Sequence, residues 1–313
     1  MNLPDLHSNS PLLESLPLSN CAGSPVWLKL EALQPSGSFK LRGIGRACQY
    51  YVNQGARGLV SSSGGNAGIA VAYAGRKLSV PVTVVVPQST TRRAMEAIRA
   101  EGAELVVFGE SWQEAHQRAR EIGGTDRVLI HPFDDPLIWD GHATMIDEIA
   151  TAGLRPDIVV LSVGGGGLLC GVIEGLHRNN LGQVPVLAVE TAGAASLAAS
   201  LQAGKHIEID HISSIATSLG AKKVAQRAFE YCSNHPVVSH VVSDGEALDA
   251  CLQFAGDHRL LVEPACGASL AAVYQKAPHL VGKKNILLIV CGGAGVSIAQ
   301  LHQWQEGLAE QGK

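Results

Sequence analysis

The sequence predicts an α/β protein with two three-layer domains, each built on a mostly parallel, twisted sheet. Short runs of β-branched and aliphatic residues alternate with stretches of helical spacing along most of the chain. These runs are apolar almost throughout, which is typical of parallel strands covered by helices on both faces. A single sheet would have to hold all of the strands side by side, so two domains with the active site between them are expected.

Composition narrows the class of protein further. The chain has 313 residues and a net charge of −4, with acidic and basic residues mixed and no basic stripe. This argues against nucleic acid or an anionic membrane surface as a partner. The start of the chain lacks the features of a signal peptide, and the seven scattered cysteines indicate reduced thiols, so a cytoplasmic location is expected. No histidine pair has the spacing of a zinc site.

The expected elements follow in order along the chain. A strand over residues 26–31 leads into the loop PSGSFKLRG. Further strands are expected at residues 58–63, 81–87, 104–109, 128–131, 157–163, 184–190, 239–243 and 285–291. Helices are expected at residues 66–76, 91–101, 112–122 and 143–152, the last of them after a loop over residues 132–141.

The loop Pro35–Gly43 is expected to present Lys40 in the first turn of a helix. Small, turn-forming residues precede Phe39 and Lys40, and the residues that follow have helical spacing. The unpaired N–H groups and the positive dipole of a helix start would lower the pKa of the Lys40 amine. A lysine with a lowered pKa can be the nucleophilic amine of a Schiff base. A lysine taken alone is far more often an ordinary surface residue, so the other motifs have to decide the role of Lys40.

Two glycine clusters follow apolar strands at equivalent places. The first, Gly164–Gly167, exposes backbone N–H groups before a helix, which suits a phosphate without a cationic side chain. It matches neither GxGxxG nor GxxxxGK[ST], which argues against a nucleotide-binding oxidoreductase and an NTPase. The second follows Cys291, at a strand end where ligands bind in open α/β sheets. A tight turn and an inert core cysteine are the structural alternatives.

A third loop, SSSGGNAG, also stands between a strand and a helix. Its residues Ser63 and Asn66, together with the loop N–H groups, could hold a carboxylate and hydrogen-bond a neighbouring oxygen. The alternative is a simple N-capped helix start. The three loops and Lys40 together form a far more specific set than any one of them alone.

In their order and spacing, these motifs resemble the fold-type II pyridoxal-phosphate enzymes, and most closely the serine dehydratases (L-serine/L-threonine ammonia-lyases). The matching segments are SGSFKLRG, SSSGGNAGIAVAYAGRKLSVPVTVVVP, HPFDDPLIWDGHA, LSVGGGGLLCGV, VEPACGASLAAVY and IVCGGAGVSIAQL. The resemblance implies the tryptophan synthase β-like fold, with a small domain over residues 35–137 and a discontinuous large domain over residues 1–34 and 138–313. The cofactor would lie in the cleft between them, and homodimers are the habit of the family.

The resemblance also implies a role for each matching site residue. Lys40 would form the Schiff base with pyridoxal 5′-phosphate, and Cys291 would face its ring nitrogen. The other cofactor contacts would come from Phe39, Asn66, which binds the 3′-oxygen, the phosphate loop Gly164, Gly165, Gly166 and Gly167, and Leu168. The substrate carboxylate would be received by Ser63, Gly64, Asn66 and Ala67. A monovalent cation such as K⁺ would bind near the phosphate loop through Glu190, Ala194 and Leu219.

The expected reaction is β-elimination. A neutral thiol cannot hold the ring nitrogen protonated, which suits loss of the Cα proton and the β-leaving group in close succession. Lys40 would remove that proton, giving pyruvate and ammonia from L-serine and 2-oxobutanoate from L-threonine. Gly64 offers no side chain to move a proton on the opposite face, which argues against racemisation, and it is expected to leave extra room. The alternatives are a cysteine-synthase-type β-replacement enzyme and a catalytically weak paralogue that binds the cofactor as a regulator.

Overall fold

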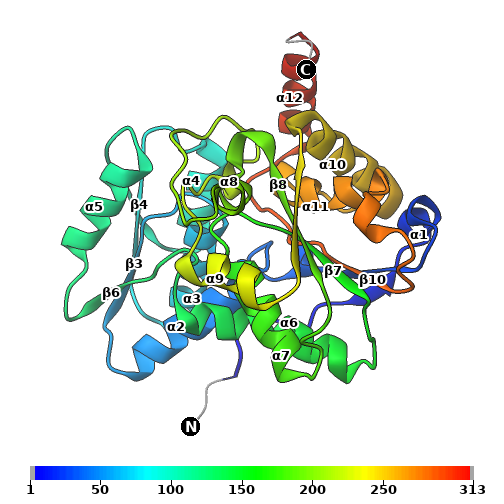
Figure 1. The fold of residues 1–313 in the computed structure, drawn as a ribbon. Coiled ribbons are helices and arrows are strands. Elements are labelled where there is room, and N and C mark those ends of the chain that lie inside the picture. The colour runs from blue at the N-terminus through cyan, green and yellow to red at the C-terminus, as the bar shows by residue number, and fades with distance from the viewer. Residues whose placement is uncertain (1–3, 311–313) are drawn as a thin grey trace.

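The computed structural model describes residues 4–310, which form two sheets flanked by helices (Figure 1). The larger sheet, on the right in Figure 1, has six strands in the order β1 (Leu12–Glu14), β2 (Val26–Lys29), β10 (Ile286–Ile289), β7 (Ile158–Ser162), β8 (Val186–Thr191) and β9 (Val237–Val242). The smaller sheet, on the left, has four strands in the order β5 (Glu104–Val107), β4 (Val82–Val86), β3 (Gly58–Ser61) and β6 (Arg127–Leu129).

The helices connect these strands and cover both sheets. In chain order they are α1 (Leu16–Ala22), α2 (Lys40–Asn53), α3 (Asn66–Leu78), α4 (Arg92–Ala100), α5 (Trp112–Ile122), α6 (Pro136–Thr151), α7 (Gly167–Arg178), α8 (Ser196–Ala203), α9 (Gln226–Asn234), α10 (Asp244–His258), α11 (Pro264–Tyr274) and α12 (Ile298–Glu310). No helix among residues 4–310 combines the length and the apolar character needed to cross a bilayer.

Each sheet is the middle layer of three. On the smaller sheet, α3 belongs to the core on one face, and α5 packs against Val60 and Val85 on the other. On the larger sheet, α11 packs against β7 and β8 with α10 beside it, while α7 packs against β7 with α6 beside it. Right-handed crossovers place α7 and α11 on opposite faces, because the chain moves along the sheet in opposite directions after β7 and after β9.

The predicted fold class is confirmed. Every strand pairing in the two sheets is parallel except that of β1 with β2, and the central strands are fully buried, as their apolar sequences predict. The strands of the smaller sheet all come from one continuous stretch of the chain. The exact division into domains at residues 34–35 and 137–138 stays a prediction.

Most predicted element boundaries differ from the observed ones by one or two residues, and two of the differences bear on the site. The helix expected at residues 143–152 begins at Pro136, because the Asp135 side chain accepts a hydrogen bond from the Leu137 N–H and caps the helix, with proline at its first position. The strand expected at residues 26–31 ends at Lys29 and gives way to a 3₁₀ turn, η1 (Glu31–Leu33).

A buried ion network holds α2 against the larger sheet. Arg42 and Glu31 are fully buried, and the guanidinium bonds both oxygens of that carboxylate, at 2.7 and 2.9 Å. Arg42 also donates to Glu148 of α6 at 2.7 and 2.8 Å, and Lys29 of β2 pairs with the same carboxylate. Two cations thus face two carboxylates, and one of the cations, Arg42, lies two residues along the chain from Lys40.

Candidate active site

The loop before Lys40 is joined by backbone hydrogen bonds to the segment that follows β10. The Phe39 N–H donates to the Cys291 carbonyl at 3.1 Å, and the Gly293 N–H donates to the Gly37 carbonyl at 2.9 Å. Gly292 has a φ of +98°, and a Cβ there would lie 2.4 Å from the Gly37 oxygen, so only glycine allows this approach. The pairing brings together two motifs that are about 250 residues apart in the sequence.

Lys40 is the first residue of α2, as predicted. Its side chain is half-buried, and Nζ donates to the Pro132 carbonyl at 2.6 Å, which excludes the surface-lysine alternative. Burial lowers the pKa of Lys40 to about 8, while Cys291 and Glu263 oppose that shift. The predicted direction is therefore confirmed, but its main cause is burial rather than the helix start.

The segment that holds the Lys40 amine also touches the glycine loop. Phe133, next to Pro132, packs so closely on the loop that a Cβ at Gly165 would lie 2.3 Å from its ring. A Cβ at Gly167 would lie 2.6 Å from the Phe133 oxygen, and Gly166 has a φ of +86°. The loop backbone is therefore packed so closely against its neighbours that only glycine fits at these positions. No side chain caps the start of α7, so its first N–H groups suit a phosphate.

Asn66 begins α3 and crosses to the larger sheet's side of the site. Its Oδ1 accepts from the Ala294 N–H at 3.0 Å, and its Nδ2 donates to Glu263 at 2.7 Å and to Ser218 at 3.4 Å. The structure thus brings Asn66 close to the segment that carries Cys291, as a shared cofactor ring would require.

Cys291 is buried and follows β10 at the carboxyl edge of the larger sheet. A hydrogen bond with Cys266 of α11 and burial both raise the pKa of its thiol well above the ordinary range. The thiol therefore stays protonated at neutral pH. A neutral group at this place agrees with the expectation for the ring-nitrogen partner, whose role itself stays a prediction.

The remaining cofactor and substrate residues lie around this centre. Phe39 is half-buried, with its ring centroid 5.2 Å from the Lys40 amine. Leu168 and Ala67 are buried in the first turns of their helices. Ser63 accepts from the Gly65 N–H at 3.3 Å, which shapes the loop before α3.

The extra room expected at Gly64 is not there. A Cβ at Gly64 would lie 2.7 Å from both Cγ2 and Oγ1 of Thr90, so the Thr90 side chain takes the space. The expectation of extra room at this position is therefore wrong, because it considered the loop sequence alone and not the neighbour that packs on it.

The three residues predicted for a cation lie near the glycine loop, and each makes contacts within the protein. Glu190, at the end of β8, is fully buried, and its two oxygens accept from the Leu197 and Ala198 N–H groups of α8 at 2.8 Å each. Burial raises its pKa to about 7. Leu219 packs on Gly164, whose Cβ would lie 2.9 Å from the Leu219 Cα, and Ala194 is buried. Cation binding here stays a prediction.

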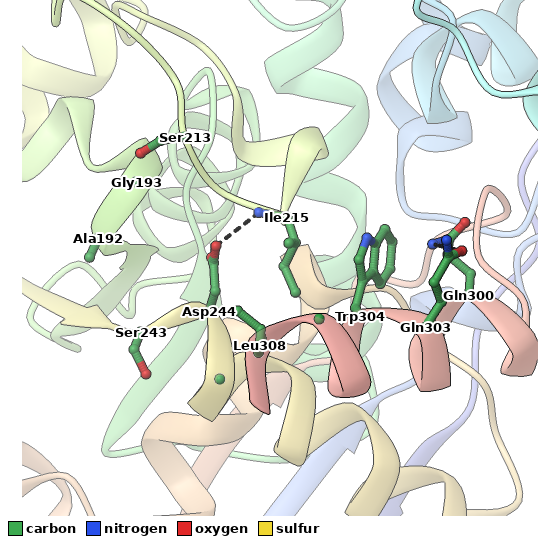
Figure 2. A pocket seen from close by; sticks show the side chains of 12 residues that line it. Ala192, Gly193, Ser213, Ile215, Ser243, Asp244, Gln300, Gln303, Trp304 and Leu308 are labelled. Atoms are coloured by element: carbon green, nitrogen blue, oxygen red, sulfur yellow. Dashed lines mark hydrogen bonds between the residues drawn. The ribbon is translucent and has the colours of Figure 1, made fainter. Parts of the chain in front are cut away.

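A separate cavity of about 680 Å³ lies beside α12 (Figure 2). Its wall joins Trp304 and Leu308 of α12 to the start of α10, where Asp244 accepts from the Ile215 N–H at 2.9 Å. None of the residues that line it is among those predicted for the cofactor or substrate. The candidate site is therefore the cluster around Lys40.

Comparison with known proteins shows the family to which the chain belongs. A family model described as "Pyridoxal-phosphate dependent enzyme" matches residues 3–292. The chain belongs to this family. It is 45% identical to the human L-serine dehydratase/L-threonine deaminase over 317 aligned positions, covering 97% of this chain and 96% of that protein. It is 43% identical to the L-serine dehydratase of Dictyostelium discoideum over 321 positions, covering 96% and 91%.

Solved structures of such enzymes have a similar fold. A fungal L-serine ammonia-lyase from Rhizomucor miehei superposes with a TM-score of 0.91 at 38% identity, covering 97% of this chain and 99% of that one. Maize serine racemase superposes with a TM-score of 0.86 at 25% identity, covering 97% and 94%. The resemblance inferred from the sequence is thereby confirmed.

Sequence reasoning missed several residues that shape the site. Pro132 and Phe133 were expected in a loop, no element or role was predicted for Thr90, and Glu263 stood within a matching segment without a role of its own. For Glu263 a signal was present, because a carboxylate set between Val262 and Pro264 in an apolar stretch is a candidate for functional burial.

Proposed function

We propose that this protein catalyses the pyridoxal-phosphate-dependent β-elimination of L-serine to pyruvate and ammonia, and of L-threonine to 2-oxobutanoate and ammonia. One observation carries the proposal. A half-buried lysine with a lowered pKa stands where a glycine loop with an uncapped helix start, an amide and a neutral thiol converge. The human relative with near-complete coverage, whose name states both activities, supports the same reaction.

The residues of the site fit the cofactor. Gly164–Gly167 and the start of α7 would hold the phosphate, Asn66 the 3′-oxygen, and Cys291 the ring nitrogen, while Lys40 would bind the aldehyde carbon. When bound, pyridoxal phosphate supplies an electron sink for the bonding pair left at Cα. The protein's own part is to orient the substrate and move the proton.

Lys40 is suited to act as the base that removes the Cα proton in this reaction. With a pKa of about 8, a useful fraction of its amine is neutral at physiological pH and can take a proton from Cα. The Pro132 carbonyl holds Nζ in place from one side. The loop with Ser63, Gly64, Asn66 and Ala67 would receive the substrate carboxylate. Gly64 carries no group that could act as a second base, so Lys40 is expected to work on one face of the substrate.

The finer points of the proposal follow from the family resemblance. We infer a monovalent cation, K⁺, at Glu190, Ala194 and Leu219, a homodimer as the working unit, and a cytoplasmic location. Enzyme assays with K⁺ replaced by Na⁺ or choline would test the cation, and light scattering would test the dimer.

Incubation of the purified protein with L-serine alone tests the reaction. Pyruvate and ammonia should appear in equal amounts, without any added nucleophile, and Lys40→Ala should abolish them together with the visible absorbance. Pyruvate absent until a sulfide is added would favour the β-replacement alternative. A yellow protein with no turnover of serine or threonine would favour the regulatory paralogue, and a colourless protein would refute cofactor binding.

A further inference from the structure

Glu263 is a carboxylate at the site to which the proposed reaction assigns no role. It is the N-cap residue of α11, a position where a carboxylate commonly accepts from its own helix, yet its side chain makes no such capping bond. It points across to α3, where it accepts from Asn66 Nδ2 at 2.7 Å. A Cβ at Gly293 would lie 2.4–2.6 Å from Glu263 side-chain atoms, so glycine is needed to admit it.

The surroundings make this placement costly for a charge. Burial raises the pKa of Glu263 to about 7, and the hydrogen bonds from Ser218 and Asn66 and the nearby Lys40 amine only partly offset it. An apolar residue at this position would avoid that cost. The hydrogen bond that the carboxylate accepts from Asn66 gives a reason for a carboxylate at this buried position.

What Glu263 holds is the orientation of the Asn66 amide. One end of the amide, Oδ1, accepts from the Ala294 N–H at 3.0 Å, and the other end, Nδ2, donates to Glu263. An amide flip would set its carbonyl against the carboxylate and its NH₂ against a donor, so both contacts forbid it. Nδ2 has a second hydrogen, whose one partner among residues 4–310 is the Ser218 hydroxyl, at the long distance of 3.4 Å. That hydrogen is left for a ligand.

We propose that Glu263 is a positioning residue for the cofactor ring: it fixes the Asn66 amide so that Nδ2 presents its free N–H to the cofactor's 3′-oxygen. The proposal rests on the cofactor-binding part of the proposed function. It predicts that Glu263 strengthens the binding of a ligand only if the ligand has that oxygen.

The test compares two ligands on full-length protein stripped of cofactor. Dissociation constants are measured spectroscopically for pyridoxal phosphate and for its analogue that lacks the 3′-oxygen, and their ratio is taken for each variant. In Glu263→Ala the preference for the 3′-oxygen should fall about tenfold, the size expected when a charge-assisted hydrogen bond is lost, and Asn66→Ala should fall at least as far. Glu263→Gln keeps an acceptor and should stay within about twofold of the wild type.

Ser218→Ala removes the long contact on the same Nδ2 and one hydrogen bond to Glu263, but it leaves the bond between Asn66 and Glu263, so the ratio should stay within about twofold of the wild type. Glu263→Met, of similar length and without an acceptor, takes the place of the alanine variant if that one does not fold. An equal loss of affinity for both ligands in the alanine and methionine variants would overturn the inference, since it would show a merely structural role. If the wild type turns over serine and the ratio stays constant, this inference alone fails; if the wild type binds neither ligand, the proposed function fails with it.

Discussion

Arg42→Met should destabilise the protein far more than an ordinary loss of one ion pair. The guanidinium is fully buried and makes two hydrogen bonds to each of two carboxylates, of Glu31 and Glu148. Its removal leaves the fully buried Glu31 without a cation, while Lys29 still pairs with Glu148. Breaking a buried pair in this way costs about 3–5 kcal/mol, a large part of a typical stability.

Urea unfolding at pH 7, with the cofactor held at one concentration, measures this loss in the free energy of unfolding. Arg118→Met is the matched control, because its pair with Glu121 is exposed on both sides and should cost under about 1 kcal/mol. An Arg42→Met protein as stable as the Arg118→Met protein would refute the reasoning. It would mean that solvent or neighbouring groups compensate the buried charge.

Three further outcomes are expected. Gly165→Ala should weaken cofactor binding by about 1–3 kcal/mol, because its Cβ would meet an aromatic ring at 2.3 Å, whereas Gly124→Ala, in open space, should not change the dissociation constant. Gly64→Ala should raise the KM for L-serine, and adding Thr90→Ala should restore it; a normal KM in the single variant would contradict the packing. In cofactor-free protein, modification of Lys40 by an amine-directed reagent should rise with a midpoint near pH 8; a midpoint above pH 10, typical of a free lysine, would contradict the effect of burial.

The parts of the site that local sequence dictates could be predicted. Strand ends followed by glycines and a helix start give the places of Gly164–Gly167, Asn66 and Lys40 without knowledge of the rest of the chain. Contacts made across the molecule could not be predicted in that way. Glu263 reaches Asn66 over nearly 200 residues of sequence, and Thr90 fills the space beside Gly64 from a turn that no pattern connects to it.

The start of α6 could not be predicted from the sequence for a different reason. Asp135-Pro136 is compatible with a turn and also with a capped helix start, and only packing decides between them. The cause of the lowered pKa of Lys40 also depends on packing. The helix start is visible in the sequence, but burial, which has the larger effect, depends on the segment around Pro132 that covers the amine.

The order of strands in the larger sheet bears on how the chain matures during synthesis. β10 lies in the interior of that sheet, between β2 and β7, although it comes last in chain order among the strands of residues 4–310. The smaller sheet, from residues 58–129, is complete long before. On a ribosome, Lys40 therefore lacks its Cys291 neighbour until β10 and the segment after it have been made, and we expect nascent chains cut short before β10 to carry an open sheet with no capacity to retain cofactor.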